Sequence, residues 1–152
     1  MSTRANVVIK NDKGEDLWLY KHHDGYVSYT GGELEFAFTF KRDVEASVEY
    51  LLENGFEVTE GEHGDIEYLY VIRNLGSNNI MISVYHYKWN GEKKEGKEIF
   101  CQSGQYKITW VKFALFVLSE KRVELEHNER YLKKELEELE FLQQDLPIKV
   151  IQ

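Results

Sequence analysis

The chain has 152 residues, of which 42% are hydrophobic and 14% aromatic, so it can form one domain with a sizeable core and is not disordered as a whole. Its formal net charge of −8 argues against the basic surface that DNA, RNA or anionic lipid requires, so we expect no direct contact with nucleic acid or membrane. The single cysteine, Cys101, cannot form an internal disulfide, which favours a cytoplasmic location.

The first forty residues predict a hairpin and a further strand. Residues 7–9 and 17–20 are short β-rich runs on either side of an Asn/Asp/Gly turn at 11–14, which is the pattern of a β-hairpin. A second turn follows at 22–25. Residues 33–40 alternate apolar and polar positions, which predicts a strand, with a helix as the alternative.

The middle of the chain predicts one short helix and more strands. Asp43 can cap a helix over residues 44–54, and Gly55 can end it. Because every gap is short, antiparallel pairing of neighbouring strands is the simplest arrangement. The expected fold class is α+β, an antiparallel sheet of about five strands with one short helix and one long C-terminal helix. The remaining strands are predicted at residues 66–74, 80–89 and 97–101.

The C-terminal segment carries a leucine at every seventh residue. No proline or glycine lies between Gly104 and Pro147, which allows one helix of up to about forty residues and roughly 60 Å. A leucine seam on such a helix needs a covering partner in water, most simply a second copy of the chain, so we expect a homodimer. The leucines of the repeat are Leu118, Leu125, Leu132, Leu139 and Leu146, and the predicted oligomerisation surface comprises Leu118, Leu125, Leu132, Leu136, Leu139 and Leu142.

This segment has two regimes, and they set the predicted domain boundaries. Residues 108–118 are apolar nearly all round, so we expect them to lie buried against the sheet within a domain of residues 1–118. Residues 119–146 form a charged amphipathic extension, and residues 147–152 form a tail. The interleaved heptad positions are polar at Arg122, Glu129 and Gln143, which weakens a long parallel zipper. Antiparallel pairing and folding back onto the domain therefore stay open.

One cluster of polar residues near the start of the chain could bind a ligand. If the hairpin forms, Arg4 can lie beside the turn that contains His22, His23 and Asp24, and this combination could hold a phosphate or carboxylate. In the alternative, the turn is structural: Asp24 caps local amides and Gly25 supplies a positive φ.

Other chemistry finds no support in the sequence. His63 and His86 lack partners at metal-ligand spacing, and no phosphate loop, dinucleotide fingerprint or nucleophile elbow is present. We therefore expect no catalytic residue, no metal and no cofactor.

Aromatic residues on the predicted strands suggest a binding surface. Alternation places Tyr68 and Tyr70 on one face, and it places Tyr85, Tyr87 and Trp89 together on a face. Rings left exposed there would form a protein-recognition surface, since Tyr and Trp anchors dominate binding energy at interfaces. In the alternative, both faces of the sheet are covered.

The opening of the chain resembles a group of small phage and prophage proteins of mostly unknown function. Those proteins begin Ser-Thr-Arg, as residues 2–4 do here, and carry a Tyr-x-His-x-Asp-Gly-Tyr segment, as residues 20–26 do here. The resemblance covers about the first thirty residues and the strand at residues 64–70. It implies a phage-type origin, and hence a place in the host-cell cytoplasm, but no established reaction.

Together these features predict a non-enzymatic interaction protein. It would bind and inhibit or redirect a host protein or nucleoprotein complex, for example as an anti-CRISPR inhibitor, with its acidic surface occupying a nucleic-acid groove. One alternative is a small-molecule or nucleotide-binding protein, with or without enzymatic activity, that uses the N-terminal cluster. Another is a structural oligomerisation module.

Overall fold

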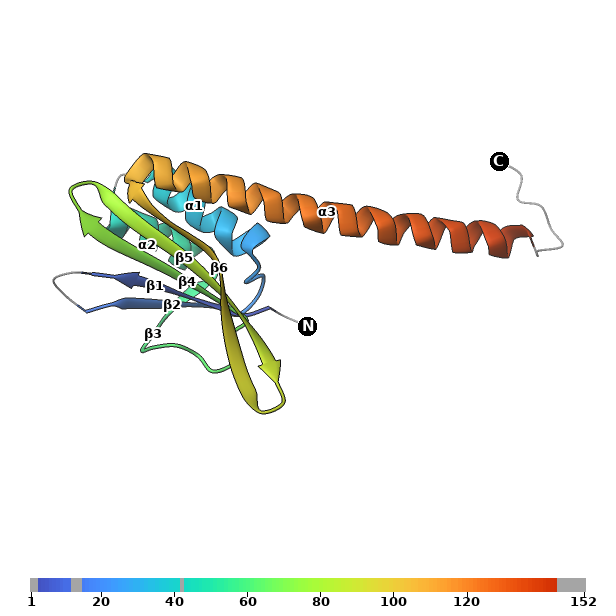
Figure 1. Cartoon of the computed structure of the whole chain (residues 1–152), viewed down its shortest axis with the longest axis horizontal. Coiled ribbons are helices and arrows are strands. Elements are labelled where there is room, and N and C mark those ends of the chain that lie inside the picture. Colours follow the sequence, from blue (N-terminus) through green and yellow to red (C-terminus); the bar gives the residue numbers. More distant parts are fainter. Residues whose placement is uncertain (1–2, 12–14, 42, 145–152) are drawn as a thin grey trace.

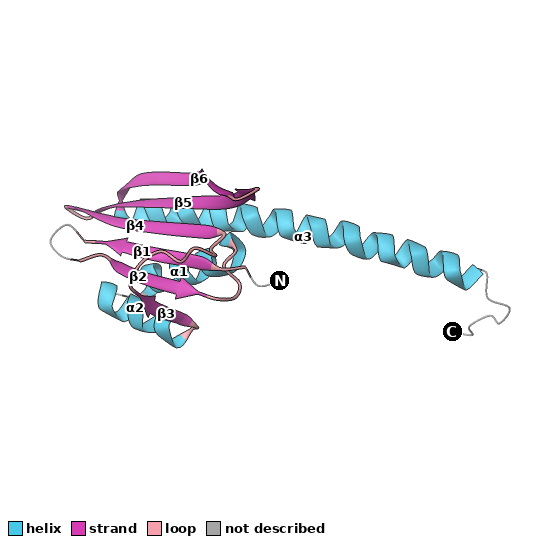
Figure 2. Ribbon diagram, turned by 90° about the horizontal axis from the view of Figure 1, so that it is seen from below, coloured by secondary structure: helices cyan, strands magenta, loops and turns pink. Residues whose placement is uncertain are grey.

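The structure, a computed structural model, describes residues 3–11, 15–41 and 43–144. It is an α+β fold in which one six-stranded mixed sheet carries the helices on a single face (Figures 1 and 2). The strands are β1 (Ala5–Lys10), β2 (Leu17–Lys21), β3 (Phe56–Thr59), β4 (Tyr68–Gly76), β5 (Asn79–Asn90) and β6 (Lys93–Gln105). The helices are the π-helical segment η1 (Val27–Gly31), α1 (Gly32–Phe40), α2 (Val44–Glu53) and α3 (Tyr106–Gln144).

The strand order, β3-β2-β1-β4-β5-β6, corrects the predicted antiparallel meander of about five strands. The hairpin of β1 and β2 is confirmed, but the chain then crosses the sheet through η1, α1 and α2. It returns as β3 on the free edge of β2 and as β4 on the free edge of β1, where β1 and β4 are parallel. Strand β3 was not predicted because four residues beside a polar stretch give too short a pattern.

Residues 33–40 form helix α1, so the predicted strand is wrong and the alternative is right. Leu34, Ala37 and Phe38 are buried, and their spacing of three and four residues is that of one helix face. Phe36 and Phe40, which a strand would have placed beside Leu34 and Phe38, stay 42% and 67% exposed. The alternating pattern was misleading because Ala37, which completes the buried face of the helix, occupies one of the positions that a strand would turn away from the core. The predicted helix over residues 44–54 is confirmed as α2, where Asp43 accepts a hydrogen bond of 2.7 Å from the amide of Ala46.

The start of α3 is fixed by aromatic packing in the main core. Trp110 stacks on Phe38 of α1 with 5.1 Å between ring centroids and meets Phe113 edge-on at 5.5 Å. Phe113 in turn contacts the ring of Phe100 on β6 at 5.5 Å. The hydroxyl of Tyr106 donates a hydrogen bond of 2.7 Å to the carbonyl of Phe38. The sheet, α1 and the base of α3 therefore form one packed unit.

Gly25 lies at a close approach of two backbone segments. The positive φ expected of it belongs to Asp24, at 57°. A Cβ on Gly25 would stand 2.9 Å from both the Cβ of Ala5 and the carbonyl carbon of Arg4. The Gly25 amide donates to the carbonyl of Thr3, and its own carbonyl accepts a 2.8 Å hydrogen bond from the buried hydroxyl of Tyr70. Glycine is therefore needed at position 25 because the neighbouring backbone leaves no room for a side chain.

The substitution Gly25→Ala is expected to lower the free energy of unfolding by about 2 kcal/mol, because the added methyl group meets backbone and Ala5 at once. Urea unfolding followed by circular dichroism measures the change. Gly64→Ala is the matched control, since a Cβ there meets nothing within 4 Å. Equal stability of the two variants would contradict the steric explanation.

Candidate functional site

Helix α3 extends far beyond the domain that holds its base. Its 39 residues begin at the edge of the sheet, and its second half projects away from every other element (Figure 1). From residue 125 to residue 141 every described side chain is exposed. The length predicted for the C-terminal helix is confirmed, and within the described residues the helix does not fold back on the domain.

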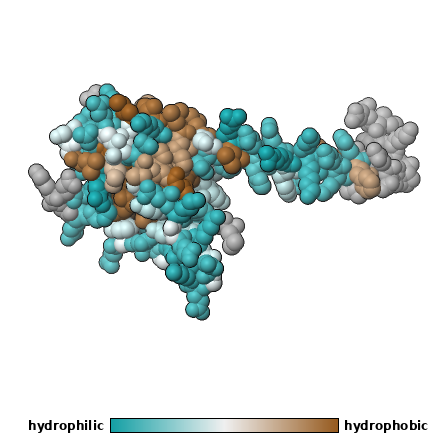
Figure 3. All heavy atoms as spheres, viewed as in Figure 1, coloured by the Kyte–Doolittle hydropathy of each residue, from teal (hydrophilic) through white to brown (hydrophobic). Residues whose placement is uncertain are grey.

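The first part of α3 is buried on one face only, so the expectation that residues 108–118 lie buried against the sheet holds for that face alone. Trp110, Phe113 and Val117 point to the core and are at most 4% exposed. On the opposite side, Leu115 and Leu118 are 61% and 58% exposed. Figure 3 shows apolar residues gathered over this part of the molecule, next to a mainly hydrophilic projecting helix.

These outward residues extend the leucine repeat backwards through the domain. They fall on the two heptad positions that the leucines occupy, so one apolar stripe follows α3 over residues 108–139. We call this stripe the α3 seam. Each apolar member is between 52% and 65% exposed: Ile108, Val111, Leu115, Leu118, Leu125, Leu132, Leu136 and Leu139. Of Leu142 only the backbone is described, and Leu146 lies outside the described residues.

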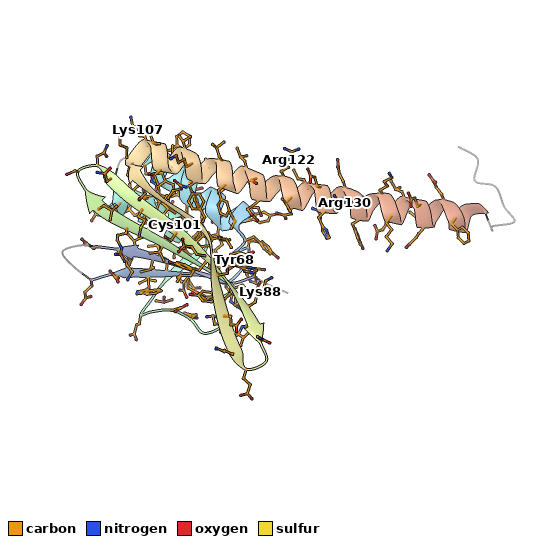
Figure 4. The ribbon with its side chains drawn as sticks, viewed as in Figure 1. Tyr68, Lys88, Cys101, Lys107, Arg122 and Arg130 are labelled. Carbon is orange, nitrogen blue, oxygen red and sulfur yellow. The ribbon has the colours of Figure 1, made fainter. Side chains whose placement is uncertain are left out.

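Two charged residues interrupt the α3 seam near its middle. Arg122 and Glu129 occupy heptad positions equivalent to those of Leu115 and Leu136. Arg122 points away from the sheet, as Figure 4 shows, and its Nε lies 3.1 Å from a carboxylate oxygen of Glu126 on the same helix. Such an exposed pair adds little stability, so Arg122 remains available to another partner.

The base of the α3 seam borders a groove between α1 and α3. Tyr29, Phe36 and Leu118 line it together with Lys121. Tyr29 and Phe36 are 52% and 42% exposed, so the apolar surface is widest where α3 meets the domain. Exposed apolar residues gathered in this way make the base of the α3 seam a candidate interaction site.

A second site candidate lies on the face of the sheet that carries no helix. Here Val8, Tyr20, Ile66 and Leu69 form a small core beneath the loop of residues 60–67. The buried Asn6 attaches this loop, because its side-chain oxygen accepts a 2.7 Å hydrogen bond from the amide of His63.

Polar side chains converge above this small core, and we call them the Tyr20 cluster: Arg4, Tyr20, His22, His63 and Asp65. The hydroxyl of Tyr20 lies 3.1 Å from Nδ1 of His22 and 3.3 Å from a carboxylate oxygen of Asp65. The His63 ring stacks on the Tyr20 ring at 3.9 Å. Burial, with the Asp65 charge as a second cause, raises the pKa of Tyr20.

Arg4 completes the Tyr20 cluster, and its Nε lies 3.4 Å from Asp65. Of the four predicted ligand-binding residues, the structure brings together Arg4 and His22. His23 is exposed, and its ring centroid lies 4.5 Å from that of His22. Asp24 lies in the turn, where its backbone carbonyl accepts a hydrogen bond from the hydroxyl of Thr30. His63 and Asp65 were missed because their loop reaches the cluster only through tertiary folding.

The five predicted partner-binding rings do not form one surface. Tyr68 and Tyr70 share a face as predicted, but this is the helix-covered face, and Tyr70 is fully buried. Tyr85 and Tyr87 lie on the opposite face, packed against the small core. Burial, with Glu62 as the second cause, raises the pKa of Tyr87 to about 12. Trp89, at 56% exposure, is near the end of the projecting β5–β6 hairpin.

Cys101 is exposed on β6, where the hydroxyl of Ser83 lies 3.5 Å from its sulfur. Among the described residues, no three His, Cys, Asp or Glu side chains are arranged to hold a metal ion. None of the helices in the described ranges combines the length and apolar composition needed to cross a bilayer.

The projecting helix with its exposed seam is thus the dominant surface feature of the molecule, and the Tyr20 cluster is the second. Comparison of the chain with protein-family models, with curated proteins and with solved structures gave no match.

Proposed function

We propose that this protein acts as a binding protein that self-associates through the α3 seam. The observation that carries the proposal is the exposure of eight apolar side chains along one stripe of α3, from Ile108 to Leu139, with charged residues only at Arg122 and Glu129. Association with a second seam removes this surface from water, which is favourable by about 25 cal/mol for each Å² of apolar area.

Self-association is tested by sedimentation equilibrium of the full chain over a wide concentration range. We expect a mass that approaches twice the 18.0 kDa of one chain as concentration rises. A mass of one chain at several hundred micromolar would overturn the proposal.

We further propose that the associated protein binds a host macromolecule and inhibits or redirects it. Two considerations support this part: the resemblance of residues 2–26 to phage proteins, and the net charge of −8, which suits contact with a basic surface such as a nucleic-acid groove. Pairing through α3 would present two copies of the domain to such a target.

This inhibitory role can be measured in a bacterium that carries an active CRISPR system. Expression of the protein is expected to raise the plaque count of a targeted phage by at least tenfold. An unchanged count, in cells where the protein is shown to be present, would remove the anti-CRISPR assignment and leave self-association untouched.

A second candidate function is the binding of a small anion at the Tyr20 cluster. The observation that favours it is the convergence of a guanidinium and two imidazoles on Tyr20 and Asp65. Inorganic phosphate and a nucleoside monophosphate are suitable probes, with isothermal titration as the measurement.

For this site, Arg4→Ala is expected to weaken phosphate binding at least tenfold, because the only guanidinium of the cluster is lost. Lys10→Ala is the matched control, since Lys10 lies at the far end of β1 and pairs with Asp16 at 3.0 Å. Equal binding by both variants would show that Arg4 only holds the loop through Asp65.

A further inference from the structure

The α3 seam has a symmetry that bears on the direction of pairing. Six of its eight apolar residues mirror one another about a midpoint between Val123 and Glu124. Ile108 and Leu139 are equally far from this midpoint, as are Val111 and Leu136, and Leu115 and Leu132. In each of these pairs the two residues belong to the two different heptad positions, and these are the positions that face each other when helices run in opposite directions. A seam reversed on itself therefore matches apolar residues with apolar residues toward both ends, whereas near the centre Leu118 and Leu125 lie opposite Glu129 and Arg122.

The charges on the seam distinguish the two directions of pairing. In a parallel pair each seam residue faces its own counterpart, so Arg122 would meet Arg122 of the second copy, and Glu129 would meet Glu129. In the centred antiparallel pair, Arg122 stands about 6 Å along the axis from Glu129 of the second copy, within reach of its long side chain. The reversed arrangement therefore replaces two contacts between like charges with two ion pairs.

The ends of the described helix repeat this contrast. Residues 106–112, at the base, contain Lys107 and Lys112 and no acid, whereas residues 135–141 contain four glutamates and no base. In the centred antiparallel register, residues 135–141 of one copy lie beside residues 106–112 of the other copy. A parallel pair would align lysines with lysines and glutamates with glutamates, which disfavours it.

The domain leaves room for this arrangement. Trp110 and Phe113 hold α3 to the core by one face, and the α3 seam lies on the opposite face, so a second helix can follow it through the base. Lys107 and Arg122 lie on the side turned away from the sheet in Figure 4. The two helices would overlap for about 48 Å, which is the length of residues 108–139.

We propose that the occupant of the α3 seam is α3 of a second copy, antiparallel and centred between Val123 and Glu124. The proposal rests on the self-association proposed above and adds its direction and register. The two domains then lie at opposite ends of a shared rod. Each helix tip packs on the base of the other helix, so Leu139 of one copy covers Ile108 of the other.

Distances between spin labels on the two copies test direction and register together. Val123, Arg130 and Glu137 are exposed and spaced by seven residues, so they share one face of α3 outside the seam. Each is replaced in turn by a labelled cysteine in the full chain, in which Cys101→Ser removes the native thiol. Pulsed dipolar spectroscopy then reads the separation between copies.

In the centred antiparallel pair, the axial separation of the labels grows from near zero at position 123 to about 20 Å at 130 and about 40 Å at 137. A short distance at all three positions would establish a parallel pair and overturn the proposal. If the separation between the labels increased from a minimum at another position, the proposed register would be wrong. The absence of any coupling between copies at all three positions would instead contradict self-association, so the two failures are distinguishable.

A charge exchange provides a second readout without labels. Arg122→Glu and Glu129→Arg are each expected to weaken dimerisation at least tenfold, because each leaves like charges in adjacent layers. The double variant, which restores both ion pairs with reversed sign, is expected to recover most of the loss. Failure of the double variant to improve on either single variant would contradict antiparallel pairing.

Discussion

The substitution Leu132→Lys is expected to convert the self-associated protein into a monomer. Leu132 lies on the α3 seam and is 57% exposed in the single chain. In a symmetric pair the substitution removes two leucines from the interface and places two charges there. Loss of about 2 kcal/mol for each leucine raises the dissociation constant about a thousandfold. Sedimentation equilibrium measures this change directly.

The neighbouring Tyr131 supplies the matched control for this experiment. It is also apolar and 59% exposed, but it lies about a third of a turn away, outside the two seam positions. Tyr131→Lys is therefore expected to leave the dissociation constant within a factor of three of the original. If both variants weakened association equally, the interface would not be the α3 seam. If neither did, α3 would not be the site of association.

The second large effect is expected in the core, where Trp110→Ala should lower the free energy of unfolding by about 4 kcal/mol. Trp110 is 2% exposed and contacts the rings of both Phe38 and Phe113. Its loss opens a cavity at the junction of α1, α3 and the sheet. Urea unfolding followed by far-ultraviolet circular dichroism gives the value.

Trp89→Ala is the control of the same residue type. Trp89 is 56% exposed on the β5–β6 hairpin, so its truncation is expected to change stability by less than about 0.5 kcal/mol. Similar losses in the two variants would show that the junction around Trp110 is not the centre of the core. The measurement is made at a fixed protein concentration, because self-association adds to the apparent stability.

The two effects belong to opposite faces of one helix. The face that carries Trp110 and Phe113 fixes α3 to the domain, and this rigid base sets the direction in which the rest of the helix projects. The opposite face carries the α3 seam over the same residues and beyond them. The domain therefore positions the binding surface without covering it.

Several features of this protein follow from local sequence. The hairpin of β1 and β2, the cap of α2 by Asp43 and the length of α3 depend on turn residues, a capping side chain and the absence of proline and glycine. The leucine repeat likewise indicated the seam. Its continuation to Ile108 was also present in the spacing, but a segment that is apolar all round hides which of its faces will be exposed.

Other features depend on contacts between segments that are distant in the chain. Residues 33–40 became a helix because their Leu34 and Phe38 meet α3 and the sheet, and their alternation alone did not distinguish the two outcomes. The parallel pairing of β1 with β4 depends on which sheet edge is free after β2 and β3 have paired. His63 and Asp65 join Arg4 and Tyr20 only because a loop more than forty residues along the chain folds over the sheet. The local elements and the seam could be predicted because each depends on near neighbours in the chain, whereas strand order and the Tyr20 cluster required the whole fold to bring remote residues together.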